Sequence, residues 1–329
     1  MLAQERFNQR FVKDFNIPIN IFNQEYFDYY RKTYDFFPNN EYEKLVEEIK
    51  NKYNNNYEEW NTVSAEKRDN IISSILKNPN YIAFNEFNMD EYSIPVKYES
   101  IPDYNIWTEQ NHLKAFLSID LKKANFQALK YHDENILFGC ETYEELLDKF
   151  NMPEHFKKSK YLRQVIFGKL NPKRVTTIQR HMMCMIHDIL MADEKSKSII
   201  NNNCKLVGIK TDELVYECNK YYWMSMTDDD LRYIEKIIKD CLDFDIRVDV
   251  FQVIDMNIYN TRGAKVSAFI KSHCFPTFKE DELKCVSTIF YPQVYKIWKR
   301  KTITEMDRVF FCEGQLATFN DNLIKRDIR

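Results

Sequence analysis

Two short acidic segments of this chain carry residues that could do chemistry. In the first, an apolar stretch from Phe116 leads to Asp120, and in the second, a stretch from Leu206 leads to Asp212 and Glu213. Because β-branched and aromatic residues precede both aspartates, we expect each carboxylate to emerge near a strand end, at one edge of a sheet. Two acids at such an edge can share divalent cations, and their oxygen atoms suit Mg²⁺ or Mn²⁺. Asp120 and Asp212 are therefore predicted metal ligands.

Phosphoryl and nucleotidyl transfer require two such ions, about 3.5–4 Å apart. Positive side chains must then meet the substrate phosphates. A basic segment between the acids could supply them, because no Asp or Glu lies between Glu154 and Asp188. Its positive residues are Lys157, Lys158, Lys160, Arg163, Lys169, Lys173, Arg174 and Arg180. We predict that Lys160, Arg163 and Arg174 bind nucleotide phosphates, and a merely solvated basic face is the alternative.

The elements that must position these residues begin after a mainly helical N-terminal region, residues 1–112. There, Glu41–Lys50 and Ala65–Leu76 place apolar residues at helical spacing, and nothing in the region carries recognisable chemistry. Residues 258–329 form a predicted β-rich extension, either a further subdomain or a continuation of the sheet. Its strand-like stretches are Val266–Ile270, Cys285–Tyr291 and Arg308–Cys312.

The central region, residues 113–257, alternates strands and helices. After the strand that ends near Asp120, the pattern predicts a short helix, a helix starting near Thr142, and a long Met-rich helix. A β-hairpin with Asp212 and Glu213 at its tip follows, then a helix that starts at Thr227 and an alternating strand. This order predicts an α+β fold, with an antiparallel sheet covered by helices.

Composition excludes several classes of protein. The 329 residues are 44% hydrophobic and 29% charged, which is typical of a globular protein rather than a disordered one. No run of about 18 apolar residues occurs, and the N-terminus lacks a secretory signal, so we expect a cytoplasmic protein that does not contact a membrane. The eight cysteines show no zinc-ligand spacing and are predicted to be reduced thiols.

The acidic segments resemble two motifs of the family A DNA polymerases. Thr-Asp-Glu-Leu-Val-Tyr-Glu at 211–217 is similar to the third motif of that family, and Ser-Ile-Asp-Leu-Lys-Lys-Ala-Asn at 118–125 is similar to the first. The resemblance covers about residues 113–255. It implies a polymerase palm, Asp120 and Asp212 as catalytic metal ligands, and Glu213 as a catalytic acid near the primer end.

The same resemblance implies partners and further site residues. A palm would act on a template, a primer and a nucleoside triphosphate, with Gln179 contacting the minor groove or the template. The basic segment at 154–175 would be a reduced counterpart of the fingers. The neighbouring positive residues then become candidates for nucleic-acid binding: Lys169, Lys173 and Arg180.

The chain departs from family A at several positions. Thr211 replaces the usual His, and Asn125 stands where family A has the Glu that excludes a ribose hydroxyl. The segment from Lys160 to Gly168 also matches the family B pattern in part. The two aspartates are 92 residues apart (212 − 120), which is closer to a reverse transcriptase. No proofreading exonuclease motif is apparent, and a compact polymerase with AT-rich residue usage would suit a virus or mobile element.

Three interpretations follow from these patterns. The first is a template-directed nucleotidyltransferase, similar to a DNA polymerase and dependent on Mg²⁺ or Mn²⁺. The second is a catalytically degenerate palm that binds nucleic acid or a replication partner. The third is an unrelated α+β protein, in which Asp120 ends a strand and Asp212 with Glu213 forms a polar turn.

Overall fold

The main sheet of this protein is antiparallel and contains both acidic segments. The computed structural model describes residues 2–201, 204–219, 226–276 and 279–326. Within these residues, the sheet has six strands in the order β2-β3-β1-β4-β7-β8. The strands are β1 (Ala115–Leu121), β2 (Cys204–Ile209), β3 (Glu213–Cys218), β4 (Ile246–Asp255), β7 (Phe269–Phe275) and β8 (Glu282–Lys284). The predicted α+β class is therefore confirmed.

The register of the central strands aligns charged residues across the sheet. Asp120 on β1 lies opposite Glu213 on β3 and opposite Arg247 on β4. Two residues earlier on β1, Ser118 lies opposite Asp249 on β4. Directly opposed residues point to the same face of a sheet, and so do residues two apart along a strand. These five polar residues therefore share one face of the sheet.

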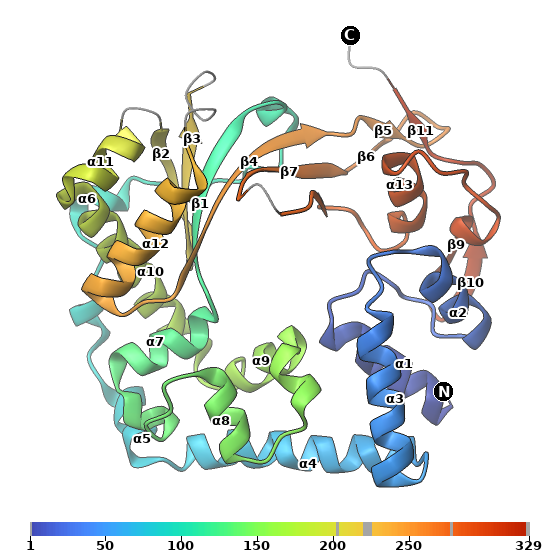
Figure 1. Ribbon diagram of the computed structural model, residues 1–329, viewed down its shortest axis with the longest axis horizontal. Helices are drawn as coiled ribbons and strands as arrows, with labels where there is room; N and C mark the ends of the chain where they lie inside the picture. Colours follow the sequence, from blue (N-terminus) through green and yellow to red (C-terminus); the bar gives the residue numbers. More distant parts are fainter. Residues whose placement is uncertain (1, 202–203, 220–225, 277–278, 327–329) are drawn as a thin grey trace.

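The opposite face of the sheet packs against helices. Leu117 and Ile119 of β1 are fully buried in the core that also contains the methionines of α10. Figure 1 shows α10, α11 and α12 stacked on this side of the sheet. The helices of the central region are α7 (Ala124–His132), α8 (Tyr143–Lys149), α9 (Lys160–Phe167), α10 (Pro172–Ala192), α11 (Glu194–Asn201) and α12 (Asp228–Leu242).

Helix starts in this region follow the predicted capping residues. Thr142 accepts a hydrogen bond from the Glu145 amide at the start of α8. Thr227 accepts one from the Asp230 amide at the start of α12, and Asp230 returns the bond in a capping box. Both predicted starts are confirmed.

The N-terminal region is helical, as predicted, and Glu41–Lys50 and Ala65–Leu76 both fall within helices. Its helices are α1 (Ala3–Asp14), α2 (Gln24–Thr33), α3 (Asn39–Tyr53), α4 (Tyr57–Leu76), α5 (Pro79–Glu86) and α6 (Val96–Glu99). Figure 1 shows the long α4 running from the N-terminal helices toward α5, past α8 and α9.

The C-terminal region both extends the main sheet and forms smaller units. β7 and β8 continue the main sheet, so it crosses the expected boundary at residue 257. The other elements are β5 (Ile258–Tyr259), β6 (Lys265–Val266), α13 (Tyr291–Trp298), β9 (Val309–Cys312), β10 (Gln315–Thr318) and β11 (Ile324–Lys325). β11, β5 and β6 form one small sheet, and β9 pairs with β10.

Two strand predictions in this region need correction. Cys285–Tyr291 is a bend and turn rather than a strand, and Tyr291 begins α13. Pro292 lies in the first turn of that helix, where the missing N–H costs no hydrogen bond. The stretch Val266–Ile270 is split between the end of β6 and the start of β7. Alternating apolar residues alone did not reveal either break.

The N-terminal and C-terminal regions of the chain are in contact. Tyr34 after α2 donates a hydrogen bond to the buried Asp307 carboxylate at 2.5 Å, and Tyr29 lies 2.9 Å from the Thr304 hydroxyl. Figure 1 shows the resulting ring-like arrangement, in which α9 lies between α7 and α1. No helix in the described residues is long and apolar enough to cross a membrane.

Candidate active site

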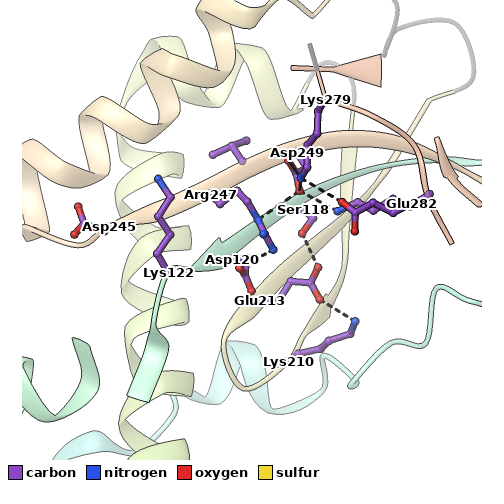
Figure 2. A network of polar contacts seen from close by, with 12 residues as sticks. Ser118, Asp120, Lys122, Lys210, Glu213, Asp245, Arg247, Asp249, Lys279 and Glu282 are labelled. Atoms are coloured by element: carbon purple, nitrogen blue, oxygen red, sulfur yellow. Dashed lines mark hydrogen bonds and ion pairs between the residues drawn. The ribbon is translucent and has the colours of Figure 1, made fainter. Parts of the chain in front are cut away.

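The charged row on the open face of the sheet centres on Asp120. Its carboxylate oxygen Oδ2 lies 3.0 Å from an Nη2 nitrogen of Arg247 on the neighbouring strand. Figure 2 shows this pair beside Glu213, on the other side of Asp120. Arg247 also lies 3.5 Å from Asp249, so one guanidinium group reaches two carboxylates on this face.

Asp212 lies in the turn of the β2–β3 hairpin, as the sequence predicts. The turn is tied to β1, because the Leu121 amide donates a hydrogen bond of 2.9 Å to the Asp212 carbonyl. Asp120 and Asp212 consequently line the same open cleft, whose volume is about 660 Å³. The cleft is lined by Asp120, Leu121, Lys122, Lys123, Ala124, Asn125, Lys160, Arg163, Gln164, Gln179, Thr211, Asp212 and Arg247.

The electrostatics of the cleft disfavour two ionised acids without added positive charge. Burial raises the pKa of Asp120 to about 6, and although Arg247 opposes the shift, the neighbouring Asp212 and Glu213 add to it. Burial and the adjacent Glu213 likewise raise the pKa of Asp212. Both carboxylates therefore hold their protons more tightly than ordinary acids.

Helix α9 supplies positive charge across the cleft from the acids. It begins at Lys160 because the Ser159 hydroxyl accepts a hydrogen bond from the Leu162 amide at 2.9 Å. Lys160 and Arg163 line the cleft, and the positive charge of Lys160 lowers the pKa of Asp212 against the larger effect of burial. Two of the three predicted phosphate-binding residues are thus brought to the acids.

Glu213 is already engaged within the protein. Its Oε1 accepts a hydrogen bond of 2.5 Å from the Ser118 hydroxyl, and its Oε2 lies 2.9 Å from the Lys210 amine. Figure 2 shows both contacts next to Asp120. Glu213 adjoins the two aspartates, but it is not among the residues that line the cleft.

Gln179 meets Asn125 at the wall of the cleft. The buried Gln179 side chain donates a hydrogen bond of 2.8 Å to the side-chain oxygen Oδ1 of Asn125. The position at which family A has an acid therefore presents an amide here, and that amide is held by α10.

The other predicted binding residues lie outside the cleft. The Arg174 guanidinium donates a hydrogen bond to the Phe87 carbonyl and lies 5.3 Å from the centre of the Phe84 ring. Those contacts anchor α10 to the N-terminal region. Lys169 and Lys173 are exposed near the start of α10, and Arg180 is half-buried further along it.

The sequence patterns missed Ser118, Lys210, Arg247 and Asp249 as neighbours of the acids. A signal existed for two of them, because Arg247 and Asp249 are charged residues two apart in the apolar first half of a strand. Residues at that spacing point to one face, which argues for a shared polar surface. Their proximity to Asp120 depended on the strand register.

A second hollow of about 360 Å³ shares Lys122 and Lys123 with the cleft. Several of its charged groups neutralise one another, because Lys130 pairs with Glu141, and Lys239 lies 2.7 Å from Asp243. Charge that is already balanced in this way gives no reason to expect an ionic ligand there.

The acids of the cleft fit a divalent cation that is also bound by substrate. In the described residues, no group of three or more His, Cys, Asp or Glu side chains is placed to hold a metal. Mg²⁺ is commonly held by one or two carboxylates together with substrate phosphates and water. Asp120 and Asp212 provide two such carboxylates, and burial together with neighbouring acids raises the pKa of each.

In comparisons with known proteins, no family model, no curated protein and no solved structure matches the chain significantly.

Proposed function

We propose that this protein is a template-directed nucleotidyltransferase that resembles a DNA polymerase palm. One observation carries the proposal: Asp120 and Asp212, from segments far apart in the sequence, line one cleft with Lys160 and Arg163. Acids held close together at one edge of a sheet and positive residues on a nearby helix are the groups that nucleotidyl transfer requires.

In this proposal, Asp120 and Asp212 hold Mg²⁺ or Mn²⁺. When bound, the ions would activate the attacking hydroxyl and neutralise the departing pyrophosphate. Lys160 and Arg163 orient the triphosphate from α9, which Ser159 caps. Glu213 remains beside the aspartates and adds negative charge to the site.

The alternative is a degenerate palm that binds nucleic acid or a replication partner without catalysis. Two ion pairs favour it, because Arg247 already contacts Asp120 and Lys210 already contacts Glu213. Internal partners of this kind would stabilise the acids without any metal.

Primer extension by the purified chain tests the proposal. The assay supplies primed DNA and RNA templates, Mg²⁺ or Mn²⁺, and both deoxy- and ribonucleoside triphosphates. We expect extension by the wild type and a loss of at least about a thousandfold in Asp120→Asn and Asp212→Asn. Asp245→Asn is the matched control, because this exposed acid lies near the site without lining the cleft.

Retention of activity in Asp245→Asn would assign the loss to the two cleft acids. If the wild type were inert under every combination, or if Asp212→Asn matched the wild type, the catalytic proposal would fail. Oligonucleotide binding by an inert wild type would favour the degenerate palm.

A further inference from the structure

A groove adjoins the acid cleft on the far side of α9. It lies between α1 and α9, has a volume of about 340 Å³, and shares Lys160 and Gln164 with the cleft. It is lined by Gln9, Val12, Lys13, Asn16, Ile17, Ile19, Asn20, Phe22, Lys160, Tyr161 and Gln164. The N-terminal region, in which the sequence shows no recognisable chemistry, thus borders the candidate active site.

The side chains of this groove suit a polyanion that carries bases. Among the described residues that line it there is no Asp or Glu, whereas Lys13 and Lys160 bring two positive charges. Lysine amines attract phosphates, and amide side chains offer both donors and acceptors to base edges. Phe22 and Tyr161 add aromatic rings, a kind of side chain on which bases can stack. The Arg10 guanidinium and the Lys13 amine lie 5.2 and 5.7 Å from the centre of the Tyr161 ring.

Several of these polar groups are free to bind a ligand. No side-chain hydrogen bond or ion pair forms within the described part of the chain at Gln9, Asn16, Lys160 or Gln164. Asn16 and Lys160 are exposed, and so is Gln164. The groove differs in this respect from the second hollow beside the cleft, where Lys130 and Lys239 are already paired with acids.

The junction beneath the groove is rigidly built. Asp14, at the end of α1, is completely buried and accepts a hydrogen bond of 2.6 Å from the Ser159 hydroxyl, which also caps α9. Arg10 lies 3.0 Å from the same carboxylate and supplies the opposing charge. A buried acid with these partners ties α1 to α9 and keeps the two walls of the groove in place.

We propose that this groove binds single-stranded nucleic acid, as the path by which a template strand reaches the acid cleft. The shared residues Lys160 and Gln164 join the groove to the cleft. That the bound strand serves as a template rests on the proposed function. Binding of a single strand is a separate property, and it needs no metal.

Fluorescence anisotropy with a labelled oligothymidylate of about 20 nucleotides, in EDTA and low salt, measures that property. We expect Lys13→Glu to weaken binding about tenfold and to reduce the slope of log affinity against log salt by about one. Asn16→Asp, which keeps the size of the side chain, should weaken binding about threefold. Lys236→Glu, an equal charge change at an exposed site on α12, should stay within about twofold of the wild type.

The outcomes separate this inference from the proposed function. If Lys13→Glu and Asn16→Asp both bound the oligonucleotide as Lys236→Glu does, the groove would not be the binding site, even with primer extension intact. If both variants weakened binding but the wild type extended no primer, the groove inference would hold and the catalytic proposal would not. A wild type that binds no oligonucleotide would overturn the inference. Circular dichroism checks that each variant is folded. If Lys13→Glu does not fold, Asn16→Asp still tests the inference.

Discussion

Two acidic centres lie on the same face of the central sheet and differ in how their charge is balanced. Asp249 is buried, with 3% of its side chain exposed, and both Lys271 and Lys279 lie 2.9 Å from its carboxylate. Asp120, on the adjacent strand, has 26% of its side chain exposed and contacts one positive residue, Arg247. It also lies among other acids.

The pKa values of the two acids shift in opposite directions. Burial would raise the pKa of Asp249, but Lys271 and Lys279 outweigh it and keep that pKa below its usual value. Burial and neighbouring acids instead raise the pKa of Asp120 to about 6. The comparison separates a carboxylate whose charge is balanced within the protein from one whose ionised form its surroundings disfavour.

The largest expected effect is the loss of stability in Asp249→Asn. This change leaves Lys271 and Lys279 with a neutral partner, and Lys271 has only 9% of its side chain exposed. We expect the free energy of unfolding to fall by about 3–5 kcal/mol, measured by urea denaturation. The matched variant Asp120→Asn should show no such loss. If the free energy of unfolding of Asp249→Asn were within about 1 kcal/mol of the wild-type value, Asp249 would not have this structural role.

The next effect is a pH dependence of stability to which Asp120 should contribute. Its pKa is raised from 3.8 to about 6, so between pH 3.8 and about 6 the folded state binds more protons than the unfolded state. The free energy of unfolding should therefore fall by up to about 3 kcal/mol as pH rises through this range. Asp120→Asn should lack this fall and be the more stable protein above this range.

Thermal and urea denaturation of both proteins across the pH range would measure the difference. Titrating groups that lie far from Asp120 contribute equally to the two proteins and cancel in the comparison. Parallel pH profiles for the wild type and Asp120→Asn would show that the carboxyl of Asp120 is not destabilised by its surroundings.

The smallest expected effect concerns Arg247, which lies between the two centres. With 51% of its side chain exposed, its ion pair with Asp120 should contribute at most about 1 kcal/mol. Arg247→Gln removes a positive charge beside Asp120, so we expect Mn²⁺ to bind roughly fivefold more tightly in the absence of nucleotide. Calorimetric titration would measure this. Unchanged or weaker Mn²⁺ binding in Arg247→Gln would show that the charge of Arg247 does not oppose metal binding.

Local patterns in the sequence predicted much of the fold. The strand alternation before Asp120, the capping residues Thr142 and Thr227, and the hairpin that carries Asp212 all depend on residues close together in the chain. Such features need no knowledge of the tertiary structure, which is why they were predictable. The turn that replaces the strand at Cys285–Tyr291 was missed because the helix signal of Pro292 came just after it.

The surroundings of the acids could not be predicted in the same way. Ser118 and Arg247 meet Glu213 and Asp120 only through the register between strands, and local composition does not specify that register. The role of α1 depends on the buried contact between Asp14 and Ser159, which are 145 residues apart. Arg174 is the opposite case, a residue that the basic segment marked as phosphate-binding but that packs against Phe84 instead.

Binding of Mn²⁺, followed by electron paramagnetic resonance in the absence of nucleotide, tests the central claim most directly. The claim is that Asp120 and Asp212 form a cation site. At a pH well above the pKa of Asp120, we expect the wild type to bind Mn²⁺ and Asp212→Asn to bind it at least about tenfold more weakly. Asp245→Asn should match the wild type. Equal Mn²⁺ affinity in the wild type and Asp212→Asn would contradict the account.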